Sequence, residues 1–230
     1  MRPSKLRAVA LAAALVGWSF AAPRVRWHPI PNASLGTALV ASTRSPLGLR
    51  PPALWSGIRY GLVTGAAAAI GVAAMTALPP VRRAMAQRDL PEHPGRWLLL
   101  SIPIGTVWAE EAAYRATLGT VAEEAFGPTR GRLLQAAAFG LWHIVDARIT
   151  GQPVIGTVLA TGIAGWFFGW LRARSGSVAA PMLVHLAVNE AAGLAALGVQ
   201  RRARRHGVIK LLGAPDRGAP TSEPTPLRPQ

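Results

Sequence analysis

Apolar runs long enough to cross a membrane recur along this chain, and they constrain its fold more than any other feature. A transmembrane helix needs about 20 mostly apolar residues. The candidate runs lie at 6–22, 55–78, 97–122, 133–145, 154–171 and 178–199. Charged residues make up only 15% of the chain, whereas soluble domains carry about 25%. The sequence therefore predicts an all-α fold, a polytopic transmembrane bundle of about six helices.

The net charge of the chain is +15, a value typical of nucleic-acid-binding domains. The basic residues, however, lie between the apolar runs, which is how polytopic membrane proteins distribute their arginines. A modest excess on one side predicts that both chain ends are cytoplasmic. We therefore expect the lipid bilayer as a partner and no nucleic acid. Because the Arg- and Ala-rich composition is typical of a GC-rich bacterial genome, we expect a multi-pass protein of the bacterial inner membrane.

Composition divides the chain into three regions: N-terminal helices with a Pro- and Arg-rich loop at 1–80, a helix bundle at 95–200, and a basic, Pro-rich, disordered tail at 201–230. Residues 23–53 lack a sustained apolar period, and residues 82–96 are polar and contain two prolines, so both stretches predict loops. The first apolar run has a basic start and a small-residue end. It therefore fits either a retained helix or a cleaved signal peptide at 1–22.

Two adjacent acids inside the third apolar run are the first sign of chemistry. An ionisable side chain inside a bilayer is unfavourable by about 3 kcal/mol or more and usually marks function. Glu111 and Arg115 are four residues apart, so they lie on one helix face and can neutralise each other. Glu110 has no such partner in its own helix, which suits it to act as a general base or acid. The alternative is a structural ion pair with one acid facing a water-filled cavity.

Two further pairs at the same spacing lie in later apolar runs. Phe139 and His143 are four residues apart, so the phenyl ring can line one side of the imidazole. His185 and Asn189 project from one helix face and can donate hydrogen bonds without a fixed charge, which suits an oxyanion stabiliser. The alternatives are a structural histidine and polar contacts between helices.

Two histidines and one carboxylate could also ligate a zinc ion. The ligands would be His143, His185 and Glu110. Their spacing differs from the soluble metalloprotease motif, in which two histidines lie four residues apart on one helix. The chain has no cysteine, which excludes a thiolate site. A water activated by a carboxylate and a water bound to zinc are therefore both compatible with the sequence.

The three motifs, taken in order, resemble the motif set of the CPBP family, the CAAX-processing and bacteriocin-processing (Abi) intramembrane endopeptidases. This family includes the type II CAAX prenyl endopeptidases, and the resemblance covers residues 95–200. The residues that carry it are Glu110, Glu111, Arg115, Phe139, His143, His185 and Asn189. Each motif lies in an apolar segment, as in the family.

The resemblance implies a protease that hydrolyses a peptide bond of a membrane-associated protein or peptide. It implies that Glu110 and His143 activate the attacking water, while His185 and Asn189 stabilise the oxyanion. The implied supporting residues are Glu111, Arg115 and Phe139. Although the family is named for metalloproteases, the resemblance implies that no cofactor is needed, with zinc as the alternative.

Two other functions are compatible with the same polar residues. A non-enzymatic membrane scaffold or immunity protein could keep them as a structural network, and a small transporter could use them as a proton relay. An inverted repeat would favour the transporter, and the sequence shows none. Nothing in the sequence identifies the substrate, its lipidation or the oligomeric state.

Overall fold

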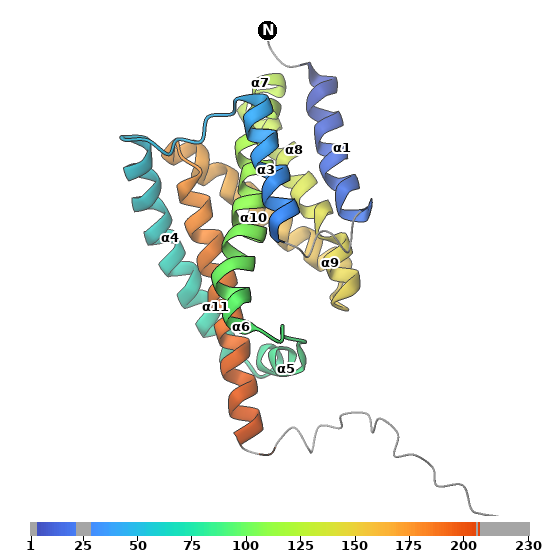
Figure 1. The fold of residues 1–230 in the computed structure, drawn as a ribbon, viewed down its shortest axis with the longest axis vertical. Helices are drawn as coiled ribbons and strands as arrows, with labels where there is room; N and C mark the ends of the chain where they lie inside the picture. Colours follow the sequence, from blue (N-terminus) through green and yellow to red (C-terminus); the bar gives the residue numbers. More distant parts are fainter. Residues whose placement is uncertain (1–3, 22–28, 206, 208–230) are drawn as a thin grey trace, which may run out of the picture.

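The computed structural model describes residues 4–21, 29–205 and 207, and most of them are helical (Figure 1). Those residues contain no strand, so the predicted all-α class is confirmed. In chain order the helices are α1 Lys5–Ala21, α3 Pro29–Thr43, α4 Ala53–Thr76, α5 Pro79–Gln87, α6 Pro94–Arg96, η1 Trp97–Trp108, η2 Glu111–Gly119, α7 Thr120–Phe126, α8 Pro128–Trp142, α9 Ile144–Ile149, α10 Val154–Ser175 and α11 Ala179–Arg205. Both η1 and η2 are π-helices, a rare geometry that is frequent at functional sites.

Three of the described helices, α4, α10 and α11, are long and apolar enough to cross a membrane. With 17 residues, α1 is shorter, and the apolar run that starts at Trp97 is divided among η1, η2 and α7. The helical membrane bundle is thus consistent with the structure, and the number of about six spans stays a prediction.

Glycines on α4 let this helix lie directly against α11. A Cβ added to Gly61 would lie 2.8 Å from the Cβ of Leu183, and one added to Gly65 would lie 3.4 Å from the Cβ of Ala187. Small residues of this kind allow close helix packing in membranes. Because the contacts advance along both helices in the same direction, α4 and α11 run parallel to each other (Figure 1).

We expect Gly61→Ala to destabilise the protein and Gly71→Ala to leave its stability unchanged or slightly raised. A methyl group at Gly61 would collide with Leu183, and overpacking of this kind costs about 1–3 kcal/mol. Gly71 lies on the same helix with no atom within 4 Å of an added Cβ, and Ala is a better helix former by about 1 kcal/mol. Thermal unfolding of the purified variants in detergent measures the difference. Equal unfolding temperatures would contradict the close contact between α4 and α11.

Two apolar clusters enclose the motif residues. On one side, Leu15 of α1 packs in a cluster with Tyr114 and Phe139. On the other side, Phe168 of α10 packs with Val184 of α11. Between these clusters the side chains of Glu111 and Arg115 are 0% exposed, so their charges must find partners inside the protein.

The stretch 23–53 contains helix α3, so the prediction of a loop there is wrong for Pro29–Thr43. Pro29 and Pro31 lie in the first turn of α3, where the backbone N–H groups have no partner within the helix and proline is tolerated. Small residues then bring α3 close to its neighbours, and a Cβ added to Gly36 would lie 2.8 Å from the carbonyl oxygen of Ala109. Helix α3 therefore covers the junction between η1 and η2.

The stretch 82–96 also differs from the predicted loop, because it contains most of α5 and all of α6. Helix α4 ends at Thr76, and Pro79 and Pro80 occupy the first turn of α5. The predicted helix at 133–145 is interrupted at His143, which lies between α8 and α9.

Helix α11 continues to Arg205, into the region predicted as a disordered tail. Apart from residue 207, the remainder of that tail lies outside the described residues, as do residues 1–3 and 22–28. Residues 6–21 of the first apolar run lie in α1, whose Ala8 and Ala12 are buried in the same cluster as Tyr114.

Candidate active site

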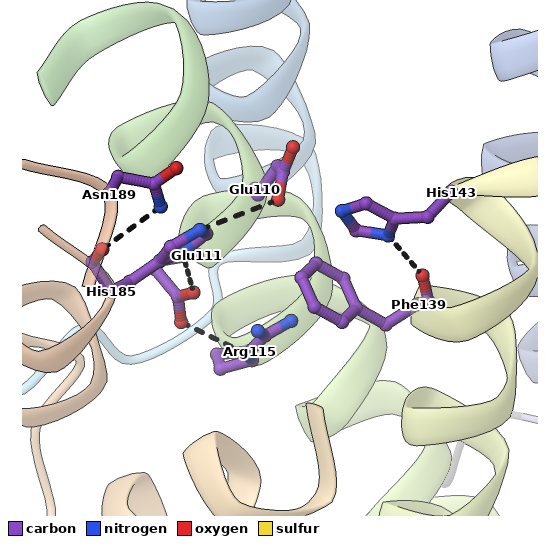
Figure 2. A network of polar contacts seen from close by, with 7 residues as sticks. All are labelled: Glu110, Glu111, Arg115, Phe139, His143, His185 and Asn189. Carbon is purple, nitrogen blue, oxygen red and sulfur yellow. Dashed lines mark hydrogen bonds and ion pairs between the residues drawn. The ribbon is translucent and has the colours of Figure 1, made fainter. Parts of the chain in front are cut away.

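The residues of the three motifs come together in one place (Figure 2). They lie at the junction of η1 and η2 (Glu110), in η2 (Glu111 and Arg115), in the last turn of α8 (Phe139), just after α8 (His143), and in α11 (His185 and Asn189). Segments that are far apart in the sequence thus build a single polar site inside the helix bundle.

Glu111 is the central anion of the site and lies between a guanidinium and an imidazole. Its Oε2 is 3.0 Å from Nε of Arg115, and the side chains of both residues are 0% exposed. The predicted pairing of Glu111 with Arg115 is therefore confirmed. The other oxygen, Oε1, is 2.8 Å from Nδ1 of His185 (Figure 2). Because a buried carboxylate must be paired to be stable, this arrangement fixes the orientation of His185.

The ring of Phe139 is in contact with the two other motifs. The guanidinium carbon of Arg115 lies 3.9 Å from the centroid of the ring, which is a cation–π contact. The ring also meets His143 edge to face at 4.7 Å between centroids, as the spacing predicts, and His185 at 6.3 Å. An added Cβ at Gly165 of α10 would lie 2.9 Å from Phe139, so the glycine makes room for the ring. Phe139 therefore holds Arg115 and both imidazoles at fixed positions.

Glu110 differs from Glu111 because one of its carboxylate oxygens has no hydrogen bond. Its Oε2 is buried and finds no hydrogen-bond partner among the described residues. Nε2 of His185 lies 3.9 Å from this oxygen, a distance that is too long for a hydrogen bond. The side chain as a whole is 12% exposed. A carboxylate oxygen in this position is available to a water molecule or a substrate.

His143 presents one ring nitrogen to the site. Its Nδ1 is 2.8 Å from the carbonyl oxygen of Phe139, and a carbonyl can only accept, so Nδ1 carries the proton and donates. In a neutral imidazole this leaves Nε2 as an acceptor. Figure 2 shows the His143 ring pointing toward Glu110. The interruption of the helix after Trp142 is what places the imidazole there.

The two polar residues of α11 are held by different partners. His185 is 7% exposed, and its Nδ1 is engaged by Glu111 while its Nε2 faces Glu110. Asn189 is partly buried and donates one amide hydrogen to the backbone carbonyl of His185 at 3.0 Å. The second amide hydrogen of Asn189 remains for another acceptor.

A small cavity adjoins Glu110 and is lined by residues that the sequence motifs did not identify. Its volume is about 20 Å³, enough for about one water molecule. Asn32 of α3, Tyr114 and Trp142 contribute to its walls. Tyr114 and Trp142 directly precede Arg115 and His143 in the sequence, and this position could have indicated that they lie near the site. Asn32 could not be identified from the sequence, because its segment was predicted to be a loop.

Phe168 was missed as well, and it lies on the other side of the site. Its ring centroid is 5.3 Å from that of His185, and the guanidinium of Arg115 lies 5.0 Å from the ring. Arg115 is therefore placed between two aromatic rings, those of Phe139 and Phe168. No periodicity in the sequence of α10 indicates this contact.

The proposed zinc ligands do not form a metal centre in this arrangement. Among the described residues, no group of three His, Asp or Glu side chains is positioned to hold a metal ion. His185 directs Nδ1 to Glu111, and His143 directs Nδ1 to a backbone carbonyl. A histidine whose Nδ1 donates to a carboxylate or a carbonyl can still ligate a metal through Nε2, so these two hydrogen bonds do not decide between a zinc site and a metal-free site.

One family model matches a segment that makes up less than half of the chain. Residues 92–191 match the family described as type II CAAX prenyl endopeptidase Rce1-like. The matched segment is similar to an Rce1-like domain. It contains all seven motif residues from Glu110 to Asn189, so the predicted family resemblance is confirmed. Neither the curated proteins nor the solved structures gave a match to this chain.

The match to the Rce1-like family indicates a class of protein and a location for this chain. This family is one of proteases. Together with the three apolar helices, the match indicates an integral membrane protein. Part of the cavity beside Glu110 lies outside the matched segment, because α1 and α3 precede residue 92.

Proposed function

We propose that the protein is an intramembrane endopeptidase that hydrolyses a peptide bond of a membrane-associated protein or peptide. The observation that carries this proposal is the buried Oε2 of Glu110, which has no hydrogen-bond partner among the described residues. The residue itself lines a cavity of about 20 Å³. The match of residues 92–191 to a protease family supports it.

In the proposed step, Glu110 accepts a proton from water while the water oxygen attacks the substrate carbonyl carbon. Nε2 of His143 accepts a hydrogen bond from the second O–H of the same water and orients it, since its Nδ1 donates to the carbonyl of Phe139. Glu110 then transfers its proton to the amide nitrogen of the leaving peptide, and the C–N bond breaks. General acid–base catalysis of this kind contributes about 10²–10⁴ in rate.

We assign the stabilisation of the oxyanion to His185 and Asn189, as hydrogen-bond donors. With the Nδ1 hydrogen donated to Glu111, Nε2 of His185 can donate only when the imidazole is protonated. The carboxylate of Glu111 stabilises the charge of that imidazolium through a charge-assisted hydrogen bond. Asn189 supplies the second donor. One of its amide hydrogens is donated to the backbone carbonyl of His185, and the other is available to the oxyanion.

Asn189→Ala is expected to lower kcat by about 10²–10³ and to leave a measurable activity, because removal of one oxyanion donor has an effect of that size. The loss should appear in kcat more than in KM, since the donor acts on charge that develops in the transition state. Steady-state kinetics measures both constants. An unchanged kcat would contradict the assignment of Asn189 to the oxyanion.

We further propose that the reaction needs no metal ion. The support for this is that no group of three His, Asp or Glu side chains among the described residues is positioned to hold a metal ion. Elemental analysis of active, purified protein tests the proposal. Zinc at one equivalent per chain, lost in His143→Ala and His185→Ala together with activity, would contradict it.

The function is tested with a panel of membrane peptides presented to the protein in liposomes. The panel pairs C-terminally prenylated peptides with the same peptides without the lipid, because the matched family is described by CAAX prenyl substrates. New peptide ends are detected by mass spectrometry.

The matched control is Glu124→Gln, which changes an exposed carboxylate near the end of α7. Cleavage by the wild type and by Glu124→Gln, but not by Glu110→Gln, is expected. Cleavage by all three proteins would contradict the proposed function.

A further inference from the structure

A group of exposed arginines lies where two of the apolar helices end. Because α4 and α11 run parallel, the end of α4 at Thr76 is on the same side as the end of α11. The apolar part of α11 stops at Val199, and arginines follow from Arg201 onward. Figure 1 shows α5 beside the lower part of α11, beyond the end of α4. The arginines at the end of α11 and those of α5 are thus placed where a bilayer changes from hydrocarbon to headgroups.

Hydrogen bonds fix α5 at this level. Gln200 of α11 donates from Nε2 to the carbonyl oxygens of Met85 at 3.2 Å and Arg88 at 2.7 Å. Thr76 at the end of α4 also donates to the sulfur of Met85 at 3.7 Å. Met85 thus faces the other helices, while Arg82 and Arg83 are exposed. A short helix with one apolar and one basic face is typical of a segment that lies in the membrane interface.

A groove of about 480 Å³ lies between α11 and the segment that follows α5. Three arginines line it, Arg88, Arg201 and Arg204, and all three are exposed. Two acids, Asp89 and Glu92, line it as well, so the groove keeps a net positive charge. The exposed Arg82 and Arg83 on α5 add to the positive charge nearby.

We propose that this groove binds the headgroup of an anionic phospholipid. Arginine forms paired, charge-assisted hydrogen bonds with phosphate oxygens, and basic residues next to a membrane span attract anionic lipids. The groove also has apolar walls, Leu90 and Leu197. These give the start of an acyl chain a surface to lie on, which a free phosphate ion would not use. The bound lipid holds α5 against the end of α11.

The test uses the full-length protein, purified in a neutral detergent, with added phosphatidylglycerol, phosphatidylcholine or inorganic phosphate. The groove variant is Arg88→Gln/Arg201→Gln/Arg204→Gln. The control variant, Arg50→Gln/Arg130→Gln/Arg174→Gln, removes the same charge from exposed arginines outside the groove. Thermal unfolding gives the stabilisation by each additive, and native mass spectrometry counts the bound lipids.

We expect phosphatidylglycerol to raise the unfolding temperature of the wild type and the control variant, and phosphatidylcholine and phosphate to have little effect. The groove variant should bind phosphatidylglycerol at least about tenfold more weakly, as expected for the loss of a hydrogen bond to a charged group. The proposal is overturned if the wild type binds both lipids equally or responds equally to phosphate. It is also overturned if the groove and control variants behave alike. None of these readouts depends on proteolysis, so they are independent of the proposed function.

Discussion

Glu110→Gln is expected to abolish peptide cleavage while the protein stays folded. The substitution keeps the size of the side chain and removes its ability to accept a proton. We therefore expect kcat to fall by a factor of about 10²–10⁴. Stability should change little, because Oε2 of Glu110 makes no hydrogen bond among the described residues. Kinetics on a substrate from the peptide panel, together with thermal unfolding of the same preparation, measures both quantities.

His143→Ala belongs to the same prediction, because the imidazole is assigned to the same water. We expect cleavage to be lost in this variant too. Glu124→Gln again serves as the control for removal of a carboxylate from the same region, and it should behave as the wild type. Full activity in Glu110→Gln would show that this carboxylate does not activate the water, whatever the result with His143→Ala.

Arg115→Ala should destabilise the protein far more than Glu110→Gln. Arg115 and Glu111 are both 0% exposed and paired at 3.0 Å, and breaking a buried pair costs about 3–5 kcal/mol because one charge is left without its partner. The variant also leaves a void between Phe139 and Phe168, the two rings that enclose the guanidinium. We therefore expect a lower yield of folded protein in detergent and a lower unfolding temperature.

The comparison of Arg115→Ala with Glu110→Gln separates structural from chemical roles in one site. Both residues come from the same motif, and only five positions separate them. Glu111 keeps its contact with His185 in the Arg115 variant, so part of the network should survive. Equal unfolding temperatures in the two variants would contradict the roles assigned to Arg115 and Glu110.

The spacing of the motif residues was sufficient to predict the ion pair between Glu111 and Arg115 and the contact of Phe139 with His143. These contacts are local, since side chains four residues apart meet on a helix surface. Spacing gives no information about contacts between helices, such as the hydrogen bond between His185 and Glu111. That contact depends on how α11 is placed against η2.

Helix α3 shows why part of the site could not be predicted from sequence. Its prolines and small polar residues suggest a loop, yet prolines are tolerated in the first turn of a helix and glycines permit close packing. The packing of Gly36 against Ala109 brings Asn32 to the cavity beside Glu110. The direction of the His143 ring was equally unpredictable, because it depends on the interruption of the helix at Trp142.

The central claim, that Glu110 makes this protein a membrane protease, is tested most directly by N-terminal proteomics of membranes. Cells without the protein are compared with cells that express the wild type, Glu110→Gln or Glu124→Gln at matched levels. We predict a set of new protein N-termini that is present with the wild type and Glu124→Gln and absent with Glu110→Gln. If the N-termini are the same with Glu110→Gln as with the wild type, or the same with and without the protein, the claim is contradicted, and a structural or transport role for the polar cluster becomes the better explanation.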